Sequence, residues 1–493
     1  MTKFARYDEK NYELTVKNPH TTLRAVRLVT NTDKYDTLVE EREALVYRAA
    51  TEELFGQIFI ITDRAAGRST VLVIPAPDFV IPCAKIEKGA VVISSEGYPI
   101  YAAECAPEHA ERAARDWYRE HYKPSTIHAM SNTWGDRHGR TRVCDEFIRR
   151  EIDSGADLGL DVVQIDDGWQ TGSPESPDEN GERFFEGDFW ELKTDIFPHG
   201  MRSLSDYARE SGVELGLWFA PHSRGVFEHF DRDLSVIEKA YREWSIRYFK
   251  LDMINLPTRH HADRMCELLE RITSHGDTSV ELDVTAEKRL GYLAAAPYGT
   301  IFVENRYTAW GSYYPYRTLR NAWMLSRYVP LSKCQFELVN PELYTEAYDP
   351  ADPFRHGSCD ADYLFATVML SNPLFWMETQ FLSDKARADL KSIIPVWKQY
   401  REELTHADVR PIGEEPSGAS LTGFAADTGE LLHLILFREA TDRDTLTVDL
   451  GVELSGVEVI KEKCPASVTA YGSRLTATVS EPRSYLWISA RKK

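Results

Sequence analysis

A lysine and an aspartate, two residues apart, end a short apolar run in the middle of the chain. Lys250 and Asp252 follow Tyr248 and Phe249, and they emerge on the same face of a strand because side chains alternate across it. A cation beside a carboxylate keeps the carboxylate ionised, which is the state that a nucleophile needs. The same pair also fits a buried ion pair at a strand end, so the neighbouring segments have to decide between the two interpretations.

Two other apolar runs end in a similar way. Residues 162–167 lead into Gly168 and Trp169, and residues 213–219 end at Trp218 and Phe219. Strands that each finish in polar or aromatic side chains are typical of a parallel barrel, whose strand ends open into one site. In this setting we favour the nucleophile interpretation of Asp252.

The segment from residue 111 to residue 410 alternates between strand-like and helix-like patterns. Strands are predicted at 127–134, 162–167, 213–219, 248–252, 279–284, 300–305, 334–338 and 373–378. Helical runs lie between most of them. This alternation predicts an α/β fold, a (β/α)8 TIM barrel rather than a doubly wound sheet.

The two flanking segments alternate apolar and polar positions, as half-buried strands do. Residues 1–110 predict an N-terminal β-sandwich domain. Residues 411–493, which begin with a linker at Pro411 to Pro416, predict a small C-terminal β-domain. The expected architecture is therefore a catalytic barrel between two β-domains.

Composition argues against several classes of function. The 493 residues carry a formal charge of −20, which argues against binding to the phosphates of nucleic acid. No apolar run is long enough to span a membrane and residues 1–8 do not resemble a signal peptide, so we expect a cytoplasmic protein without a membrane partner. Seven cysteines without close pairing fit reduced thiols, and the sequence has no HExxH or CxxC motif, so we expect neither a metal nor a cofactor.

The predicted strand ends gather carboxylates, amides and indoles at one end of the barrel. Carboxylates bind pairs of hydroxyl groups, and indole rings stack on the C–H faces of pyranose rings. This mixture predicts a small carbohydrate as the substrate, with two further carboxylates acting as nucleophile and general acid. The expected substrate contacts are Trp134, Asp166, Asp167, Trp169, Trp218, Lys250, Asn255, Asp283 and Arg306.

Three motifs carry a resemblance to a known family. Asp166-Asp-Gly-Trp169, Gly216-Leu-Trp-Phe-Ala-Pro221 and Lys250-Leu-Asp-Met253 resemble the barrel of the melibiase-type α-galactosidases, glycoside hydrolase family 36 and its clan. The resemblance implies a retaining glycoside hydrolase that cleaves terminal α-galactosides or close analogues. It also implies that no cofactor is needed, and it allows for a homo-oligomer.

The resemblance assigns roles to individual residues. Asp252 matches the nucleophile on the fourth barrel strand, and Lys250 matches a lysine that contacts the bound sugar. The remaining matches are Asp166 and Asp167, as ligands of sugar hydroxyls, and Trp134 and Trp169, as walls of the pocket.

Two segments depart from the family pattern. The family's acid/base is an aspartate after a serine at the end of the sixth strand, whereas this chain has Val303-Glu304-Asn305 there. We therefore predict Glu304 as the acid/base, with a salt bridge to Arg306 as the alternative. A retaining pair requires carboxyl groups about 5–5.5 Å apart. After the fifth strand, Asp283 stands where the family has a cysteine, which changes the substituent that the site accepts.

Two alternatives remain at this stage. A transglycosylase of the raffinose-synthase type uses the same barrel, and an aromatic segment such as Tyr313–Tyr316 would favour a sugar acceptor over water. A sugar-binding relative without turnover is the other alternative, because the usual acid/base motif is missing.

Overall fold

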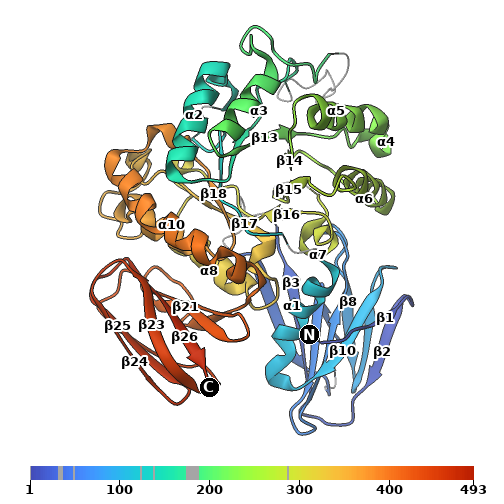
Figure 1. Ribbon diagram of the computed structural model, residues 1–493. Helices are drawn as coiled ribbons and strands as arrows, with labels where there is room; N and C mark the ends of the chain where they lie inside the picture. Colours follow the sequence, from blue (N-terminus) through green and yellow to red (C-terminus); the bar gives the residue numbers. More distant parts are fainter. Residues whose placement is uncertain are drawn as a thin grey trace.

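Eight parallel strands close into a barrel at the centre of the protein (Figure 1). The computed structural model describes residues 2–30, 37–47, 50–122, 125–136, 139–173, 188–285 and 288–493. The barrel strands are β11 (Met130–Asn132), β12 (Val162–Ile165), β13 (Glu214–Phe219), β14 (Tyr248–Leu251), β15 (Ser279–Asp283), β16 (Thr300–Phe302), β17 (Cys334–Leu338) and β18 (Asn372–Phe375). Each strand pairs in parallel with the next and β18 pairs with β11, which confirms the predicted (β/α)8 barrel.

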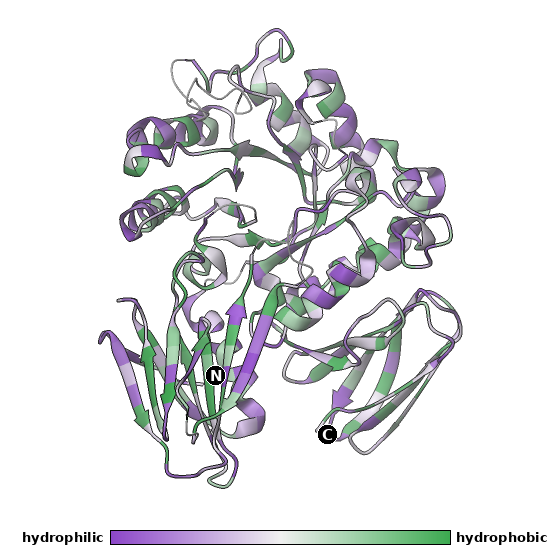
Figure 2. Cartoon of the chain, turned by 180° about the vertical axis from the view of Figure 1, so that it is seen from behind, coloured by the Kyte–Doolittle hydropathy of each residue, from purple (hydrophilic) through white to green (hydrophobic). Residues whose placement is uncertain are grey.

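Helices follow the strands around the outside of the barrel. They are α2 (Asp145–Leu158), α3 (Gly200–Glu210), α4 (Arg224–Phe227), α5 (Phe230–Glu243), α6 (Arg259–Thr273), α7 (Gly291–Ala295), α8 (Pro315–Leu325), α9 (Ala361–Val368) and α10 (Asp384–His406). Their sequences carry hydrophilic and hydrophobic residues in turn, as Figure 2 shows. In α6 the buried residues are Ala262, Met265, Leu268, Leu269 and Ile272, which repeat at helical spacing and place one apolar face against the barrel.

The N-terminal β-sandwich lies below the barrel in Figure 1. One antiparallel sheet has the order β1-β10-β7-β6-β3-β4 and the other β2-β9-β8-β5. The strands are β1 (Ala5–Tyr7), β2 (Asn11–Thr15), β3 (Thr22–Leu28), β4 (Val39–Leu45), β5 (Glu52–Phe55), β6 (Ile58–Asp63), β7 (Arg68–Val73), β8 (Cys83–Glu87), β9 (Ala90–Ser94) and β10 (Ile100–Cys105). Helix α1 (Ala110–His121) then connects this domain to the barrel.

The C-terminal β-domain also lies below the barrel, beside the N-terminal domain (Figure 1). Sheets of five and three strands, β19-β20-β21-β26-β23 and β22-β25-β24, enclose its own apolar core. The strands are β19 (Asp408–Gly413), β20 (Leu421–Asp427), β21 (Leu431–Arg438), β22 (Thr445–Asp449), β23 (Leu454–Glu462), β24 (Ala466–Tyr471), β25 (Arg474–Val479) and β26 (Ser484–Lys492).

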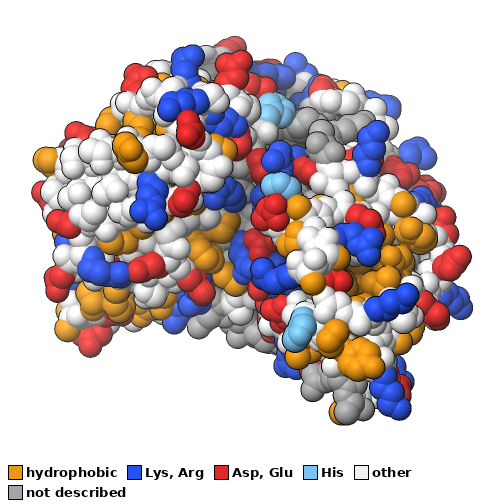
Figure 3. Space-filling model, turned by 90° about the horizontal axis from the view of Figure 1, so that it is seen from below, with side chains coloured by type: hydrophobic (Ala, Val, Ile, Leu, Met, Phe, Trp, Pro, Cys, Tyr) orange, Lys and Arg blue, Asp and Glu red, His pale blue; other side chains and the backbone are white. Residues whose placement is uncertain are grey.

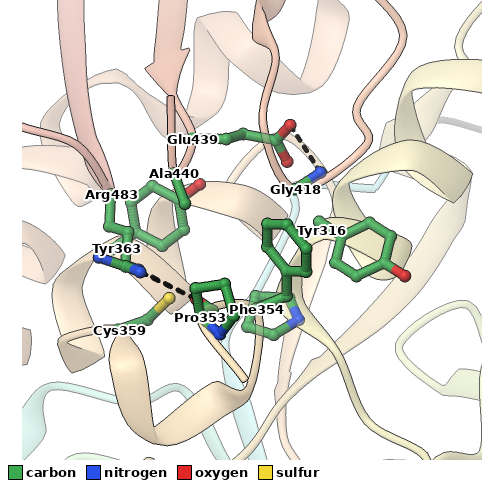
Figure 4. A pocket seen from close by; sticks show the side chains of 10 residues that line it. Tyr316, Pro353, Phe354, Cys359, Tyr363, Gly418, Glu439, Ala440 and Arg483 are labelled. Atoms are coloured by element: carbon green, nitrogen blue, oxygen red, sulfur yellow. Dashed lines mark hydrogen bonds between the residues drawn. The ribbon is translucent and has the colours of Figure 1, made fainter. Parts of the chain in front are cut away.

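The seam between this domain and the barrel is built from polar and aromatic side chains (Figure 4). Arg483 donates to the carbonyl of Pro353 at 3.0 Å, and the Glu439 carboxylate accepts from the backbone N–H of Gly418 at 2.9 Å. The Arg483 bond joins the C-terminal domain to the segment between β17 and α9 of the barrel, whereas the Glu439 bond lies within the C-terminal domain itself.

The surface seen from below is hollowed between the two β-domains (Figure 3). Acidic and basic side chains lie interspersed on this face, so the excess of negative charge is not gathered there into one patch. Among the helices that the structure describes, none is long and apolar enough to cross a membrane.

Candidate active site

Asp252 lies directly after β14, at the carboxyl end of the fourth barrel strand. Its backbone N–H still donates to the carbonyl of Phe219 on β13 at 3.1 Å, which keeps it in line with the barrel wall. The next residue, Met253, has φ of 55° and donates its backbone N–H to Asp252 Oδ1 at 2.6 Å. A non-glycine residue in the left-handed region is strained, and such strain concentrates at functional sites.

Three donors from different elements hold the Asp252 carboxylate. Arg289 Nη2 lies 2.9 Å from Oδ1, Trp218 Nε1 donates to Oδ2 at 3.0 Å, and Lys250 Nζ lies 3.5 Å from Oδ2. Burial alone would raise the pKa of Asp252, but Lys250, Arg289 and the Trp218 donor outweigh it and hold the pKa well below its usual range. The carboxylate therefore stays ionised at neutral pH.

The exposure of this cluster is uneven. The Asp252 side chain is 17% exposed, whereas those of Lys250 and Arg289 are 5% and 4% exposed. The anion thus faces the opening of the barrel, and the cations that stabilise it lie behind it.

Asp166 lies directly after β12, the second barrel strand, and forms a salt bridge with Lys250. Its Oδ2 accepts from Lys250 Nζ at 2.9 Å and from Asn132 Nδ2 at 2.8 Å, and its Oδ1 accepts from the backbone N–H of Asp167 at 2.9 Å. Although burial lowers the pKa of Lys250, the charges of Asp166 and Asp252 outweigh that effect and raise it. Asp166 therefore positions a permanent cation between two carboxylates.

Asp167 lies next to this pair. Gln170 Nε2 donates to its Oδ1 at 2.5 Å, and Arg140 Nη1 lies 3.8 Å from its Oδ2. Burial, helped by the charge of Asp166, raises the pKa of Asp167 to about 6. Its Oδ2 is more loosely held than its Oδ1, and sugar contact by Asp167 remains a prediction.

Asp283 ends β15, the strand beside β14. Its Oδ1 accepts from the Thr285 hydroxyl at 2.7 Å and from the Thr285 backbone N–H at 3.0 Å, and Arg289 Nη1 lies 3.6 Å from it. One guanidinium group thus contacts both Asp252 and Asp283. Burial and then the charge of Asp252 raise the pKa of Asp283 to about 7. Asp252 and Asp283 therefore lose their protons in well-separated pH ranges.

Arg289 is the main site residue that sequence patterns do not reveal. It lies six residues past the end of β15 in an irregular segment, and no motif or spacing links it to β14. The N-terminal domain holds this segment, because Asp78 donates its backbone N–H to the Arg289 carbonyl at 3.3 Å and the Tyr292 hydroxyl donates to the Val29 carbonyl at 3.2 Å. Gly291 has φ of 69°, and a Cβ there would lie 2.8 Å from Asp78 Oδ1.

The structure contradicts the expectation that Glu304 faces Asp252 as the acid/base. Its side chain is fully buried, and its two oxygens accept from the Thr318 hydroxyl at 2.7 Å and from Asn321 Nδ2 at 2.6 Å, both on α8. Strand β16 ends at Phe302, and the chain that follows turns Glu304 outward into the layer between strand and helix.

Arg306 contacts Glu304 and the turn that follows β16. Its Nε lies 3.8 Å from Glu304 Oε1, and its Nη1 donates to the carbonyl of Ser312 at 3.4 Å. The salt bridge with Glu304, the alternative expected from the sequence, is therefore found, and sugar contact by Arg306 remains a prediction.

Trp169 also lies outside the site. Its Nε1 donates to the Trp218 carbonyl at 3.0 Å, and its ring packs 5.8 Å from the rings of Trp190 and Trp244 with 1% of the residue exposed. The ring fills the space behind β13, where a sugar has no access, which contradicts its prediction as a pocket wall.

The remaining predicted contacts differ in their positions. Trp134 is half-buried and packs against the apolar cluster inside the barrel, and Trp218 orients the Asp252 carboxylate. Asn255 lies on the exposed segment past Asp252, where its backbone N–H donates to the Ser223 hydroxyl at 3.2 Å. Trp134 and Trp218 thus stay near the barrel mouth, and sugar contact by them and by Asn255 remains a prediction.

A group of potential metal ligands lies after β13. In the described part of the chain, His222, Glu228 and His229 are one trio of side chains whose ligand atoms lie within 4.8 Å of one another. Burial and the neighbouring charges of His229, Arg232 and Arg224 lower the pKa of His222 to about 4. Two arginines so near oppose a divalent cation, and the chemistry of the Asp252 cluster requires none.

Replacing Glu304 with glutamine is expected to lower stability and leave kcat unchanged. The amide places an N–H₂ group against a donor from α8, so one buried hydrogen bond is lost, at a cost of about 1–3 kcal/mol in the free energy of unfolding. Denaturant unfolding and steady-state kinetics on the same preparation measure both quantities. A loss of kcat of about 10²-fold or more at unchanged stability would return Glu304 to a catalytic role.

Comparison with known sequences gives matches to the barrel. The melibiase family model matches residues 108–249, a segment that includes Asp166 and Asp167 and ends directly before Lys250. The α-galactosidase Mel36A of Lactobacillus acidophilus is 28% identical over 111 residues, which are 22% of this chain and 13% of that protein. An α-galactosidase of Oryza sativa subsp. japonica is 26% identical over 157 residues, which are 29% of this chain and 34% of that protein. The matched segments therefore span only an eighth and a third of these curated relatives.

Comparison with solved structures covers nearly the whole chain. The GH36 α-galactosidase AgaA of Geobacillus stearothermophilus, in a variant complexed with raffinose, has a TM-score of 0.71 at 14% identity over 98% of this chain and 76% of that one. The α-galactosidase of Lactobacillus brevis has a TM-score of 0.72 at 10% identity over 98% of this chain and 75% of that one. At such identities the likeness concerns the fold. Taken together, the chain resembles the melibiase-type α-galactosidases in the sequence of its barrel and in its three-part architecture.

Proposed function

We propose that this protein is a retaining glycoside hydrolase that acts on α-galactosides. The observation that carries the proposal is the Asp252 carboxylate, which is held ionised at the end of the fourth barrel strand by Lys250 and Arg289 and faces the barrel mouth. A fixed anion that is partly exposed and backed by buried cations has the properties of a glycosidase nucleophile.

In the first step an Asp252 oxygen attacks the anomeric carbon. The bond from that carbon to the aglycone oxygen breaks, and Asp283 donates its proton to the leaving oxygen. The product is a glycosyl ester of Asp252 and a free aglycone hydroxyl. Lys250 and Arg289 lower the basicity of Asp252, which makes its carboxylate a good leaving group in the second step.

In the second step the ionised Asp283 takes a proton from water, and the water oxygen bonds to the anomeric carbon. The ester bond breaks, and Asp252 regains its negative charge. Two displacements at the same carbon give net retention of configuration.

Asp283 takes the role of acid and base in place of Glu304 for two reasons. It shares Arg289 with Asp252, whereas Glu304 is turned toward α8. Its pKa of about 7 suits a group that alternates between the two protonation states near neutral pH, and the depressed pKa of Asp252 suits the nucleophile.

A cytoplasmic location belongs to the same proposal. All seven cysteines are free thiols, which fits a reducing compartment.

The proposal is tested by following the hydrolysis of an aryl α-galactoside by proton NMR. The α-anomer of galactose is expected to appear first, and the β-anomer to follow by mutarotation. Initial release of the β-anomer would contradict retention. Binding of galactose without any cleavage of the aryl substrate would favour a sugar-binding protein instead.

A further inference from the structure

One contact between the N-terminal domain and the barrel lies at the segment that carries Arg289, just before α7 (Figure 1). Asp78, in the loop between β7 and β8, donates its backbone N–H to the Arg289 carbonyl at 3.3 Å. Its side chain lies against Gly291, where a Cβ would be 2.8 Å from Asp78 Oδ1. A loop of the N-terminal domain is therefore fitted closely to the backbone of residues 289–291.

The loop that carries Asp78 is itself rigid. It contains Pro75 and Pro77, whose rings fix φ, and the Val80 backbone N–H donates to the Pro77 carbonyl at 2.9 Å. Asp78 Oδ2 accepts a hydrogen bond from the hydroxyl of Thr30, which lies shortly after β3. Asp78 is thus anchored in its own domain and presents fixed groups to the Arg289 segment.

The position of that segment matters because Arg289 contacts both carboxyl groups of the proposed reaction. Its Nη2 lies 2.9 Å from Asp252 Oδ1, and its Nη1 lies 3.6 Å from Asp283 Oδ1 and donates to the Asp283 carbonyl. On the barrel side, the Leu256 backbone N–H donates to the Lys288 carbonyl at 2.8 Å. The backbone is therefore held between the barrel and the Asp78 loop, and a shift toward either side would move the guanidinium relative to both carboxyl groups.

Asp78 acts on this segment through its shape and its hydrogen bonds rather than through a charge. Burial raises the pKa of Asp78 to about 8, although the charge of Arg27 on β3 opposes the shift. The phenols of Tyr118 on α1 and Tyr292 on α7 also interact with Asp78, and burial raises their pKa values too. The Asp78 carboxyl group is therefore mostly neutral at pH 7, and asparagine reproduces it in shape and in charge.

We propose that Asp78 is a positioning residue of the active site, because it fixes the backbone of residues 289–291 and thereby holds the Arg289 guanidinium between Asp252 and Asp283. The inference rests on the proposed function and deepens it, since it makes a loop of the N-terminal domain necessary for the geometry of the barrel site. Without the Asp78 side chain the segment is free to move into the space left behind, and Arg289 withdraws from both carboxyl groups.

The test follows the hydrolysis of α-galactosyl-(1→6)-glucose by Asp78→Ala as a function of pH. We expect kcat/KM at neutral pH to fall about 10- to 100-fold, the usual effect of a small misplacement in an active site. We also expect the decline above about pH 7, which reports Asp283, to move upward by about one pH unit, because a more distant Arg289 favours the ionised form of Asp283 less. A mere loss of stability lowers the amount of folded enzyme and leaves the shape of the pH profile unchanged.

Two further variants test the same contact. Asp78→Asn is expected to keep most of the activity and the pH profile of the unmodified protein, because the amide fills the same space. Gly291→Ala disturbs the contact from the other side, since its Cβ would lie 2.8 Å from Asp78 Oδ1, and it is expected to shift the profile as Asp78→Ala does. It also provides the measurement if Asp78→Ala does not fold.

The matched control is Glu41→Gln, which weakens a different contact between the N-terminal domain and the barrel. Glu41 on β4 accepts from Arg327 Nη1 at 2.5 Å and from the Tyr328 hydroxyl at 2.6 Å, and its replacement is expected to leave the pH profile unchanged.

Two results would overturn the role of Asp78 and leave the proposed function intact. One is an unchanged pH profile in folded Asp78→Ala or Gly291→Ala, and the other is an equal shift in Glu41→Gln, because any loosening of the domain would then suffice. Absence of turnover by the unmodified protein, with this sugar and with an aryl α-galactoside, would overturn the proposed function and this inference with it.

Discussion

Replacing Asp252 with glycine is expected to lower kcat for an aryl α-galactoside by at least about 10⁴-fold, because no other group on that face of the sugar forms the glycosyl ester. The variant also loses the anion that two buried cations share. Since Lys250 and Arg289 are 5% and 4% exposed, we expect the free energy of unfolding to fall by about 3 kcal/mol. Initial rates and denaturant unfolding measure these two effects.

Azide separates the loss of a nucleophile from a general loss of structure. The space that the Asp252 carboxylate leaves admits a small anion, and Lys250 and Arg289 attract it. Azide is therefore expected to restore turnover in Asp252→Gly and to give β-galactosyl azide, since a single displacement inverts the anomeric carbon. Undiminished hydrolysis in a correctly folded variant would assign the nucleophile to another residue.

The parts of this site that follow from strand geometry are the parts that sequence patterns predict. Lys250 and Asp252 share a face because they are two residues apart on one strand, and β14 pairs with β13 so that Trp218 lies beside Lys250. The barrel follows from the alternation of strand and helix, which is repeated often enough to be recognised without any tertiary information.

The positions of side chains that lie beyond the strand ends are not predictable in this way. Glu304 lies two residues beyond the end of β16, so the alternation that would aim it inward no longer applies, and donors on α8 decide its direction. Arg289 reaches Asp252 because the N-terminal domain holds its loop, a contact between segments about 200 residues apart. Trp169 is placed by packing against Trp244, which no local pattern encodes.

Replacing Asp283 with asparagine is expected to lower kcat/KM for α-galactosyl sugars by about 10²–10⁴-fold, the usual contribution of a general acid. A dinitrophenyl galactoside is expected to lose much less in this value, because its leaving group departs without a proton.

The pH dependence of the unmodified protein gives a second measurement of the role of Asp283. Asp283 must be protonated to donate, and with a pKa of about 7 its protonated fraction falls as the pH rises. For the unmodified protein, kcat/KM for substrates with a sugar leaving group is therefore expected to fall above about pH 7. No matching decline is expected in mildly acidic solution, because the pKa of Asp252 is well below its usual range.

In Asp283→Asn the decline above neutral pH is expected to disappear, since no proton donor remains to titrate. Azide is expected to speed the second step without base assistance and to give α-galactosyl azide, the opposite anomer from that of Asp252→Gly, because the Asp252 ester still forms first. Glu304→Gln is the matched control, since it neutralises the other candidate carboxyl group. If Glu304→Gln, and not Asp283→Asn, shows the dependence on leaving group and the α-azide product, then the side chain of Glu304 swings from α8 into the barrel during catalysis and Asp283 is a positioning residue for Arg289.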